Sequence, residues 1–285
     1  MKPSCPAGHI APELPALIRQ ALREDIGSGD LTTRALIAPA RVVTAVVIAR
    51  QTGVFCGGMI AARIFRELDP KSRIKLSAAD GCRFQKNQEL MRVTGKARAI
   101  LAGERTALNF LQRLTGIATL TAQFVAKVRP YGTRILDTRK TTPLWRALEK
   151  YAVRCGGGTN HRMGLYDQVL IKDNHLRLLR RGGLAEAVRT ARRRCPGAPI
   201  EVEVETLSQL EQVLAARPDW ILLDNMTPAQ LRRCVRLCQG RARLEASGGI
   251  TLANVKAVAA TGVQAISLGC LTHSAPAADL ALEIL

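Results

Sequence analysis

The sequence predicts an α/β protein in which a small mixed domain precedes an incomplete parallel barrel of six or seven strands. Three observations predict it. Strand and helix patterns mix irregularly up to about Thr115, a long amphipathic stretch follows, and after Tyr131 short apolar runs alternate with helical stretches. Irregular mixing is typical of α+β domains, whereas regular alternation is typical of parallel sheets covered by helices.

In the first region, apolar residues at helical spacing predict helices and β-branched runs predict strands. Helices are expected at residues 14–22 and 58–68, and strands at 41–50, on both sides of 80–82, and at 89–93. The amphipathic stretch from Gly103 to about Val128 predicts one long helix, or two in series, that connects the two regions.

In the second region, each predicted strand is short and apolar and ends in polar or glycine residues. The strands are expected at residues 134–138, 168–172, 199–204, 220–224, 243–247 and 264–268. Parallel strands joined by right-handed crossovers form either an open doubly wound sheet or a barrel. Six strands are too few for the eightfold barrel, so we expect an incomplete one.

The carboxyl ends of these strands carry many charged side chains, and ligands bind at that edge in both architectures. The residues there are Thr138, Arg139, Lys140, Lys172, Asp173, Asn174, His175, Asp224, Asn225, Ser247, Gly248, Gly249 and Gly269. Because strand side chains alternate, Glu201, Glu203 and Glu205 share one face, pointing into the barrel. Interior carboxylates need cations, and Lys140 and Lys172 are the expected partners.

Two further patterns predict anion binding. Ser247-Gly248-Gly249-Ile250-Thr251 allows close backbone approach and is expected to lead straight into a helix, which suits a phosphate, with Gly269 to Thr272 as the second side of the cradle. Arg139, Arg162 and Lys172, with His161 beside them, supply enough charge to bind two adjacent carboxylates.

Composition limits the classes of function. With 47% hydrophobic residues the chain can bury a substantial core, and no apolar run approaches the roughly 20 residues of a membrane helix. Prolines in residues 1–15 argue against a signal peptide, so a cytoplasmic protein is expected. The net charge of +19 would attract polyanions, but only 4% of residues are aromatic. We interpret the arginine clusters as solvated helix faces: Arg177, Arg180, Arg181, Arg189, Arg192, Arg193, Arg194, Arg232, Arg233 and Arg236.

The eight cysteines are scattered along the chain. No Cys-x-x-Cys pair or histidine ladder accompanies them, so the sequence indicates neither a zinc site nor a disulfide framework. We expect buried thiols, with Cys234 and Cys238 one helical turn apart in ordinary packing.

Taken together, these motifs resemble the quinolinate phosphoribosyltransferase family along nearly the whole chain, in order. The segments that carry the resemblance are 29–33, 103–109, 138–143, 154–165, 170–175, 201–205, 222–226, 245–250 and 268–271.

The resemblance implies an N-terminal α/β sandwich over residues 1–115, a C-terminal open barrel over 116–285, and a homodimer in which Arg105 enters the partner's site. It implies that quinolinate is held by Arg105, Thr138, Arg139, His161, Arg162 and Lys172. Lys140, Glu203 and Asp224 would be catalytic and face the ribose, the pyrophosphate and Mg²⁺, with the two carboxylates binding the metal directly or indirectly. Ser247, Gly248, Gly249, Leu268 and Gly269 would bind the 5′-phosphate, with His273 as a weaker candidate. No organic cofactor is expected, consistent with the absence of a G-x-G-x-x-G fingerprint.

Three alternatives remain open at this point. Lys140 or Lys172 at a strand end could form a Schiff base with a carbonyl substrate. The basic surface could bind nucleic acid, which the scarcity of aromatic residues disfavours. The chain could also be a paralogue within the family that uses another pyridine or anion.

Overall fold

The computed structural model describes residues 12–179 and 183–285, which form two compact units. The first unit comprises the described part of Met1–Ala122, Thr142–Gly157 and Ser274–Leu285. The second comprises Gln123–Thr141 and the described part of Gly158–His273. The first unit therefore includes two segments from later in the chain, so the two units are not continuous stretches of sequence.

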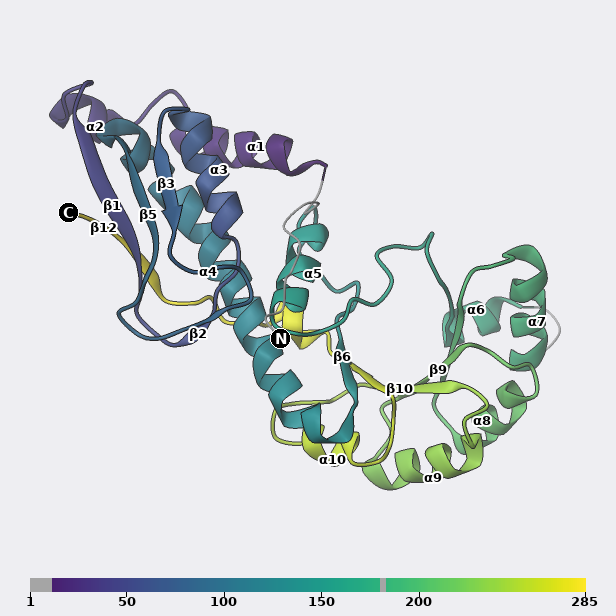
Figure 1. Cartoon of the computed structure of the whole chain (residues 1–285). Helices are drawn as coiled ribbons and strands as arrows, with labels where there is room; N and C mark the ends of the chain where they lie inside the picture. Colours follow the sequence, from purple (N-terminus) through teal and green to yellow (C-terminus); the bar gives the residue numbers. More distant parts are fainter. Residues whose placement is uncertain (1–11, 180–182) are drawn as a thin grey trace. The chain divides into compact units, whose positions relative to one another are not determined.

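The first unit is built on an antiparallel sheet with the strand order β12-β1-β5-β3 (Figure 1). Its strands are β1 (Val42–Ala49), β3 (Arg73–Leu76), β5 (Glu89–Lys96) and β12 (Leu280–Ile284), and β2 (Gly53–Val54) pairs separately with β4 (Arg83–Phe84). The predicted strands are all present. Strand β12 was not predicted, and it pairs with β1 so that Ala45 lies opposite Ile284.

The helices of the first unit are α1 (Leu14–Ile26), α2 (Leu31–Leu36), α3 (Gly58–Leu68), α5 (Arg146–Cys155) and most of α4 (Ala97–Val128). The last residues of α4, from Gln123, and the 3₁₀ turn at Arg129–Tyr131 belong to the second unit. The amphipathic stretch is one helix, six residues longer at its start than predicted. Helices α3 and α4 pack closely at Gly103, where a Cβ atom would lie 3.0 Å from the Leu68 side chain. Helices α2 and α5 were not predicted.

Helix α5 is fixed to α4 by a buried carboxylate. Glu149 is fully buried and accepts hydrogen bonds from Arg113 Nε at 3.1 Å and Nη2 at 2.7 Å. It also accepts from the Thr142 amide and hydroxyl, at 3.1 and 2.9 Å. A buried charge needs such partners, so these bonds hold residues 142–155 in place.

The second unit is built on a six-stranded parallel sheet with the order β6-β11-β10-β9-β8-β7. The strands are β6 (Arg134–Leu136), β7 (Val169–Ile171), β8 (Ile200–Val204), β9 (Trp220–Asp224), β10 (Arg243–Ser247) and β11 (Ala265–Ser267). Among the described residues β6 and β7 do not pair with each other, so the barrel is open. The predicted α/β class and incomplete six-stranded barrel are confirmed.

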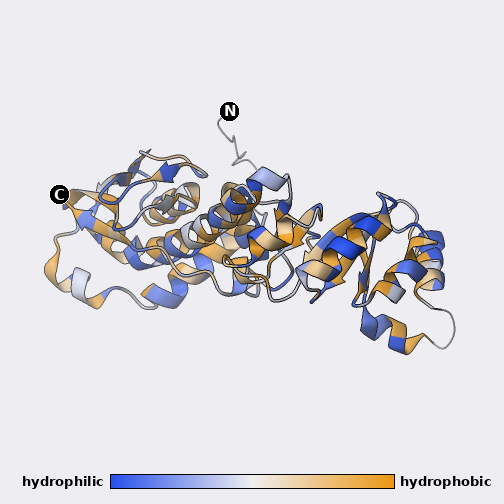
Figure 2. Cartoon of the chain, turned by 90° about the horizontal axis from the view of Figure 1, so that it is seen from below, coloured by the Kyte–Doolittle hydropathy of each residue, from blue (hydrophilic) through white to orange (hydrophobic). Residues whose placement is uncertain are grey.

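Helices cover the outer face of this sheet: α7 (Leu184–Arg194), α8 (Leu207–Leu214), α9 (Pro228–Cys238) and α10 (Val255–Ala259), while α6 (Asp173–Leu178) and α11 (Cys270–His273) follow strand ends. Figure 1 shows α8, α9 and α10 succeeding one another around it. Thr206 and Thr227 start α8 and α9 with reciprocal capping boxes. Figure 2 shows helices in both units with one hydrophobic and one hydrophilic side, as amphipathic periodicity predicts.

The surface fits the expectation from composition. The clustered arginines of α7 and α9 are exposed, while Arg180 and Arg181 lie outside the described residues.

The cysteines only partly follow the expectation of buried thiols. Cys56, Cys155, Cys234 and Cys238 are buried, whereas Cys82 and Cys195 are exposed and Cys5 lies outside the described residues. In the described ranges, no helix combines the length and hydropathy needed to span a membrane.

Candidate active site

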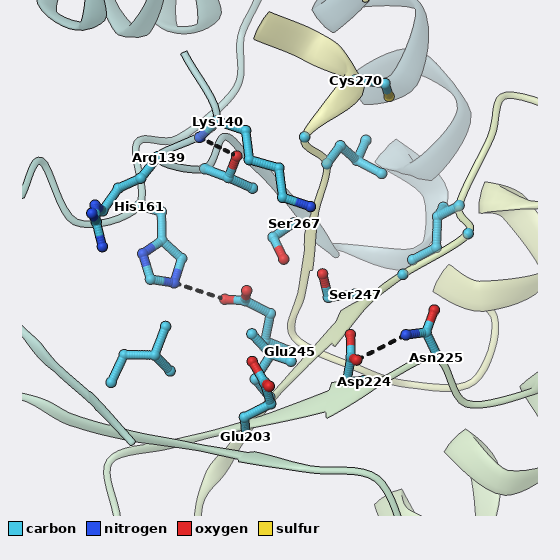
Figure 3. Close-up of a pocket in the computed structure, with 18 of the residues that line it drawn as sticks. Arg139, Lys140, His161, Glu203, Asp224, Asn225, Glu245, Ser247, Ser267 and Cys270 are labelled. Atoms are coloured by element: carbon cyan, nitrogen blue, oxygen red, sulfur yellow. Dashed lines mark hydrogen bonds and ion pairs between the residues drawn. The ribbon is translucent and has the colours of Figure 1, made fainter. Parts of the chain in front are cut away.

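A pocket of about 850 Å³ lies in the second unit, at the carboxyl ends of the strands (Figure 3). Every predicted site residue except Arg105 lines it. These residues are Thr138, Arg139, Lys140, His161, Arg162, Lys172, Glu203, Asp224, Ser247, Gly248, Gly249, Leu268, Gly269 and His273. Arg105 is exposed on α4, in the first unit, and does not line the pocket.

Cations gather along one part of the pocket wall. Arg162 Nη1 donates a hydrogen bond to the Gln168 carbonyl at 3.1 Å, which fixes the guanidinium. Burial, and then the neighbouring charge of Arg139, lower the pKa of Arg162 from its usual value. Both causes disfavour the charged form of the Arg162 guanidinium. A bound anion would favour that charged form.

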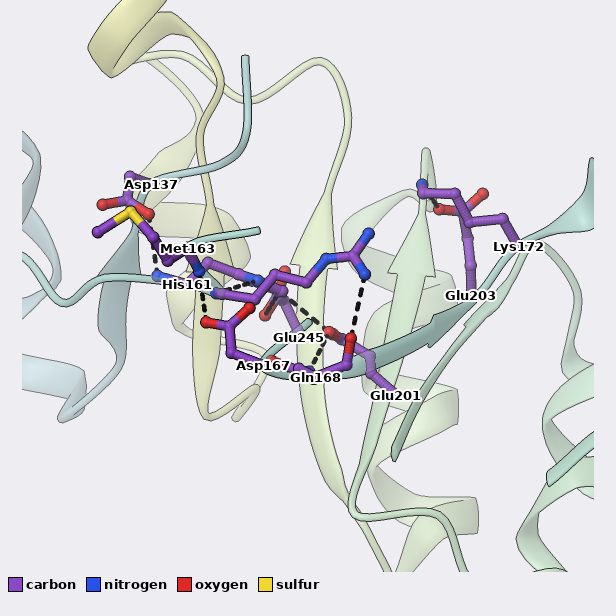
Figure 4. Close-up of polar contacts among 10 residues, drawn as sticks. Asp137, His161, Met163, Asp167, Gln168, Lys172, Glu201, Glu203 and Glu245 are labelled. Carbon is purple, nitrogen blue, oxygen red and sulfur yellow. Dashed lines mark hydrogen bonds and ion pairs between the residues drawn. The ribbon is translucent and has the colours of Figure 1, made fainter. Parts of the chain in front are cut away.

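Carboxylates lie near these cations. Lys172 Nζ forms an ion pair with Glu203, the partnership predicted from the sequence (Figure 4). Asp224 accepts a hydrogen bond from Asn225 Nδ2 at 2.8 Å. Lys140 differs from the prediction, because no ion pair joins its amine to a described carboxylate. Its side chain points toward Ser267 in Figure 3.

Glu205 also departs from the expectation that three glutamates share the interior face. Strand β8 ends at Val204, and Glu205 is exposed, with its amide donating to Gln209 Oε1 at 2.7 Å. The alternation of side chains therefore stops one residue too early for Glu205 to enter the barrel.

In the pocket wall, His161 lies beside two buried carboxylates, Glu201 and Glu245 (Figure 4). Its Nε2 lies 3.0 Å from Glu201 Oε2 and 3.7 Å from Glu245 Oε2. Its Nδ1 accepts the Arg162 amide at 2.7 Å, and its own amide donates to buried Asp137 at 2.9 Å. These contacts tie the loop that carries Arg162 to Asp137, which follows β6, and to Glu201 near the start of β8. Burial, followed by the charge of Glu201, raises the pKa of Glu245 to about 8.

The variant Glu245→Gln tests the raised pKa of Glu245. Because the folded protein holds the proton more tightly than the unfolded chain does, Glu245 stabilises the fold fully below its unfolded pKa and loses that contribution as pH rises toward 8. A glutamine does not titrate, so the variant does not lose this stability as pH rises. Urea unfolding should show the variant gaining stability relative to wild type from about pH 6 to about pH 8, by at most about 1.4 kcal/mol per pH unit. If the difference in stability between the variant and wild type stays constant across that pH range, the pKa of Glu245 is not raised.

The glycine loop after β10 is built differently from the sequence prediction, because Asn225 occupies the space that Gly248 leaves. Gly248 has φ +91°, and a Cβ there would lie 2.1 Å from Asn225 Oδ1. The expected helix does not follow directly, because α10 begins only at Val255. Instead, Asn254 donates to the Gly249 carbonyl and accepts the Thr251 amide, closing a turn. An anion here would meet loop amides rather than a helix terminus.

Comparison with known proteins decides the family. Residues 30–115 match the N-terminal domain model of quinolinate phosphoribosyl transferase, and residues 117–283 match its C-terminal domain model. The chain belongs to the quinolinate phosphoribosyltransferase family. The resemblance inferred from the sequence motifs is thereby confirmed.

Relatives of this phosphoribosyltransferase are similar over nearly their whole length. A probable carboxylating nicotinate-nucleotide pyrophosphorylase of Bacillus subtilis is 42% identical over 273 residues, covering 95% of this chain and 93% of the relative. The corresponding protein of Mycobacterium leprae is 43% identical, covering 94% and 95%. The solved nicotinate-nucleotide pyrophosphorylase of Francisella tularensis is 40% identical with a TM-score of 0.92, covering 95% and 96%.

Sequence reasoning assigned no role to one ionisable group of this pocket, Glu245. Glu245 lies in β10 between apolar neighbours. Its place two residues before Ser247, on the same strand face, is the signal that could have revealed it.

Proposed function

We propose that this chain transfers the phosphoribosyl group of phosphoribosyl pyrophosphate to the ring nitrogen of quinolinate, releasing pyrophosphate and CO₂ and forming nicotinate mononucleotide for de novo NAD biosynthesis. One observation carries the proposal: a single pocket brings together the cations Arg139, Arg162 and Lys172, the carboxylates Glu203 and Asp224, and a glycine loop. This combination suits a dianionic pyridine and a phosphorylated sugar.

On the quinolinate side, Arg139, Arg162 and Lys172 would pair with the two adjacent carboxylates, since guanidinium groups bind carboxylates bidentately. Thr138 and His161 would lie beside them. The Lys172 amine is engaged in an ion pair with Glu203, so it is not positioned to attack a carbonyl, which disfavours the Schiff-base alternative for this lysine.

On the ribose side, loss of pyrophosphate builds positive charge on the sugar. Glu203 and Asp224 would stabilise that charge, and Lys140 would stabilise the leaving group. Ser247, Gly248, Gly249, Leu268 and Gly269 would hold the 5′-phosphate. The two carboxylates are oxygen donors of the kind Mg²⁺ prefers, so they would bind the metal, directly or through water, and it would neutralise pyrophosphate charge.

Decarboxylation would then follow without an organic cofactor. After ribose is attached, the pyridinium nitrogen is cationic and can stabilise the carbanion left when the adjacent carboxylate departs as CO₂. A proton from solvent then bonds to that carbon and completes nicotinate mononucleotide. The surrounding cations would hold the remaining carboxylate and so fix the ring.

We further propose that the protein works as a homodimer and that Arg105 completes the pocket of the partner subunit. One fact supports this role: the Arg105 side chain is exposed on α4, where a partner could meet it. A twofold arrangement would make the donation reciprocal.

Mononucleotide formation from quinolinate, with nicotinate as the matched control, tests the function. We expect quinolinate to be used and nicotinate to be rejected, because a single carboxylate would engage fewer of the cations that line the pocket than two adjacent carboxylates would. Comparable turnover of nicotinate would show that a different pyridine is the substrate.

A further inference from the structure

The first unit contains a second cluster of chemically reactive side chains, unrelated to the pocket. Cys56 lies between β2 and α3, Asp80 follows β3, and Cys155 is the last residue of α5. The two sulfur atoms and an Asp80 carboxylate oxygen all lie within 4.8 Å of one another. Both cysteines are buried, and Asp80 is half-buried.

Both cysteines are fixed against α4. The Cys56 amide donates to Thr115 Oγ1 at 3.2 Å, and that hydroxyl lies 3.1 Å from the Cys56 carbonyl. Next to Cys155, a Cβ on Gly156 would lie 2.4 Å from the Ala118 carbonyl, so the end of α5 touches the α4 backbone. The two thiols are therefore held near each other by the helix on which both segments pack.

The Asp80 carboxylate is also held in place. It accepts the amides of Gly57 and Gly58 at 3.0 Å each, and the Tyr151 hydroxyl at 2.8 Å. Three donors hold this carboxylate in one orientation. They leave part of its capacity of about four lone-pair sites for another ligand. A carboxylate in a fixed orientation thus lies beside the two thiols.

We propose that Cys56, Asp80 and Cys155 form a binding site for one thiophilic divalent cation of the zinc class. Two sulfurs and one carboxylate oxygen suit Zn²⁺, whereas Mg²⁺ and Ca²⁺ require oxygen ligands and Cu⁺ prefers sulfur alone. Donor atoms around a tetrahedral zinc lie roughly 3.5–3.8 Å apart, from bond lengths of about 2.0–2.3 Å.

The binding step is a simple exchange. Each thiol loses its proton to solvent as its sulfur bonds the cation, so two protons leave for each ion bound and no electron is transferred. The site then carries two thiolates, one carboxylate and the divalent ion. A fourth tetrahedral position remains for water.

The test uses the full-length chain, stripped with a chelator and titrated with Zn²⁺ and Co²⁺. We expect one Zn²⁺ per chain at this site, with release of about two protons, seen by calorimetry in buffers of different ionisation enthalpy. With Co²⁺, a thiolate-to-metal charge-transfer band should appear and Zn²⁺ should abolish it. Cobalt held by the pocket carboxylates would give no such band.

Variants locate the site. Cys56→Ser and Cys155→Ser should each remove the charge-transfer band, and Asp80→Asn should weaken binding at least tenfold. Cys234→Ser, a buried cysteine of the second unit, and Cys270→Ser, which lines the pocket, are the matched controls and should retain the band.

An independent measurement covers variants that fail to fold. In the wild-type protein, bound Zn²⁺ should protect Cys56 and Cys155 from alkylation, as mass spectrometry of the peptides can show. The proposal is overturned if wild type shows no thiolate band, if the band survives in both cysteine variants, or if the two sulfurs join in a disulfide that forms equally with Zn²⁺ present.

Discussion

Arg105→Ala and Lys172→Ala chains, each nearly inactive alone, should regain about a quarter of wild-type activity per site once their subunits are exchanged. If Arg105 serves the partner's pocket, a mixed dimer has one site with both defects and one with neither. Random exchange makes about half of the dimers mixed, and half of their sites are intact. Activity assays after mixing, with native mass spectrometry to count hybrid dimers, measure the recovery.

A mixture of Arg139→Ala with Lys172→Ala chains is the matched control. Both residues line the pocket of one unit, so every site in that hybrid carries a defect and activity should stay low. If Arg105 hybrids form and remain as inactive as this control, Arg105 does not act across an interface.

Glu203→Ala and Asp224→Ala should lower turnover by about 10²–10³-fold while quinolinate binding changes little, since stabilisation of developing charge is realised in the transition state. Asp224→Ala is the cleaner variant, because its hydrogen-bond partner is neutral Asn225. Glu203→Ala also releases Lys172 from its ion pair. Saturation kinetics and direct binding of quinolinate separate the two effects.

Glu205→Ala provides the comparison for Glu203→Ala, because this exposed carboxylate follows β8 and does not line the pocket. Its turnover should equal that of wild type. Circular dichroism checks that each variant is folded. If quinolinate affinity collapses in Asp224→Ala while turnover at saturation survives, the carboxylate has been assigned to the wrong substrate.

The parallel sheet and most of the pocket could be predicted from sequence because their signals are local. A buried parallel strand is a short apolar run, and the residue that ends it lies where ligands bind. Thus Lys172 and Asp224 could be placed at the same edge without knowing their distance. Glu245 was missed because it lies inside such a run, where one charged residue does not disturb the apolar pattern.

The features that could not be predicted depend on contacts between distant segments. Strand β12 pairs with β1, which lies far from it in the sequence. Because β12 follows the barrel strands along the chain, the sequence order favours the wrong sheet. Cys56 and Cys155 satisfy no motif spacing, because α4, not a short loop, brings them together. Pattern reading detects periodicity within an element, whereas these placements follow from how separate elements pack.

Strand β12 also sets an order of events during synthesis. Its partner β1 leaves the ribosome early, yet the last strand of the first sheet emerges only after all six strands of the barrel. Nascent domains generally fold as their sequence becomes available. Here the first sheet must wait with the β1 edge uncovered, and exposed edges invite pairing with other chains. The nascent protein is therefore most in need of chaperone protection while the barrel is still being translated.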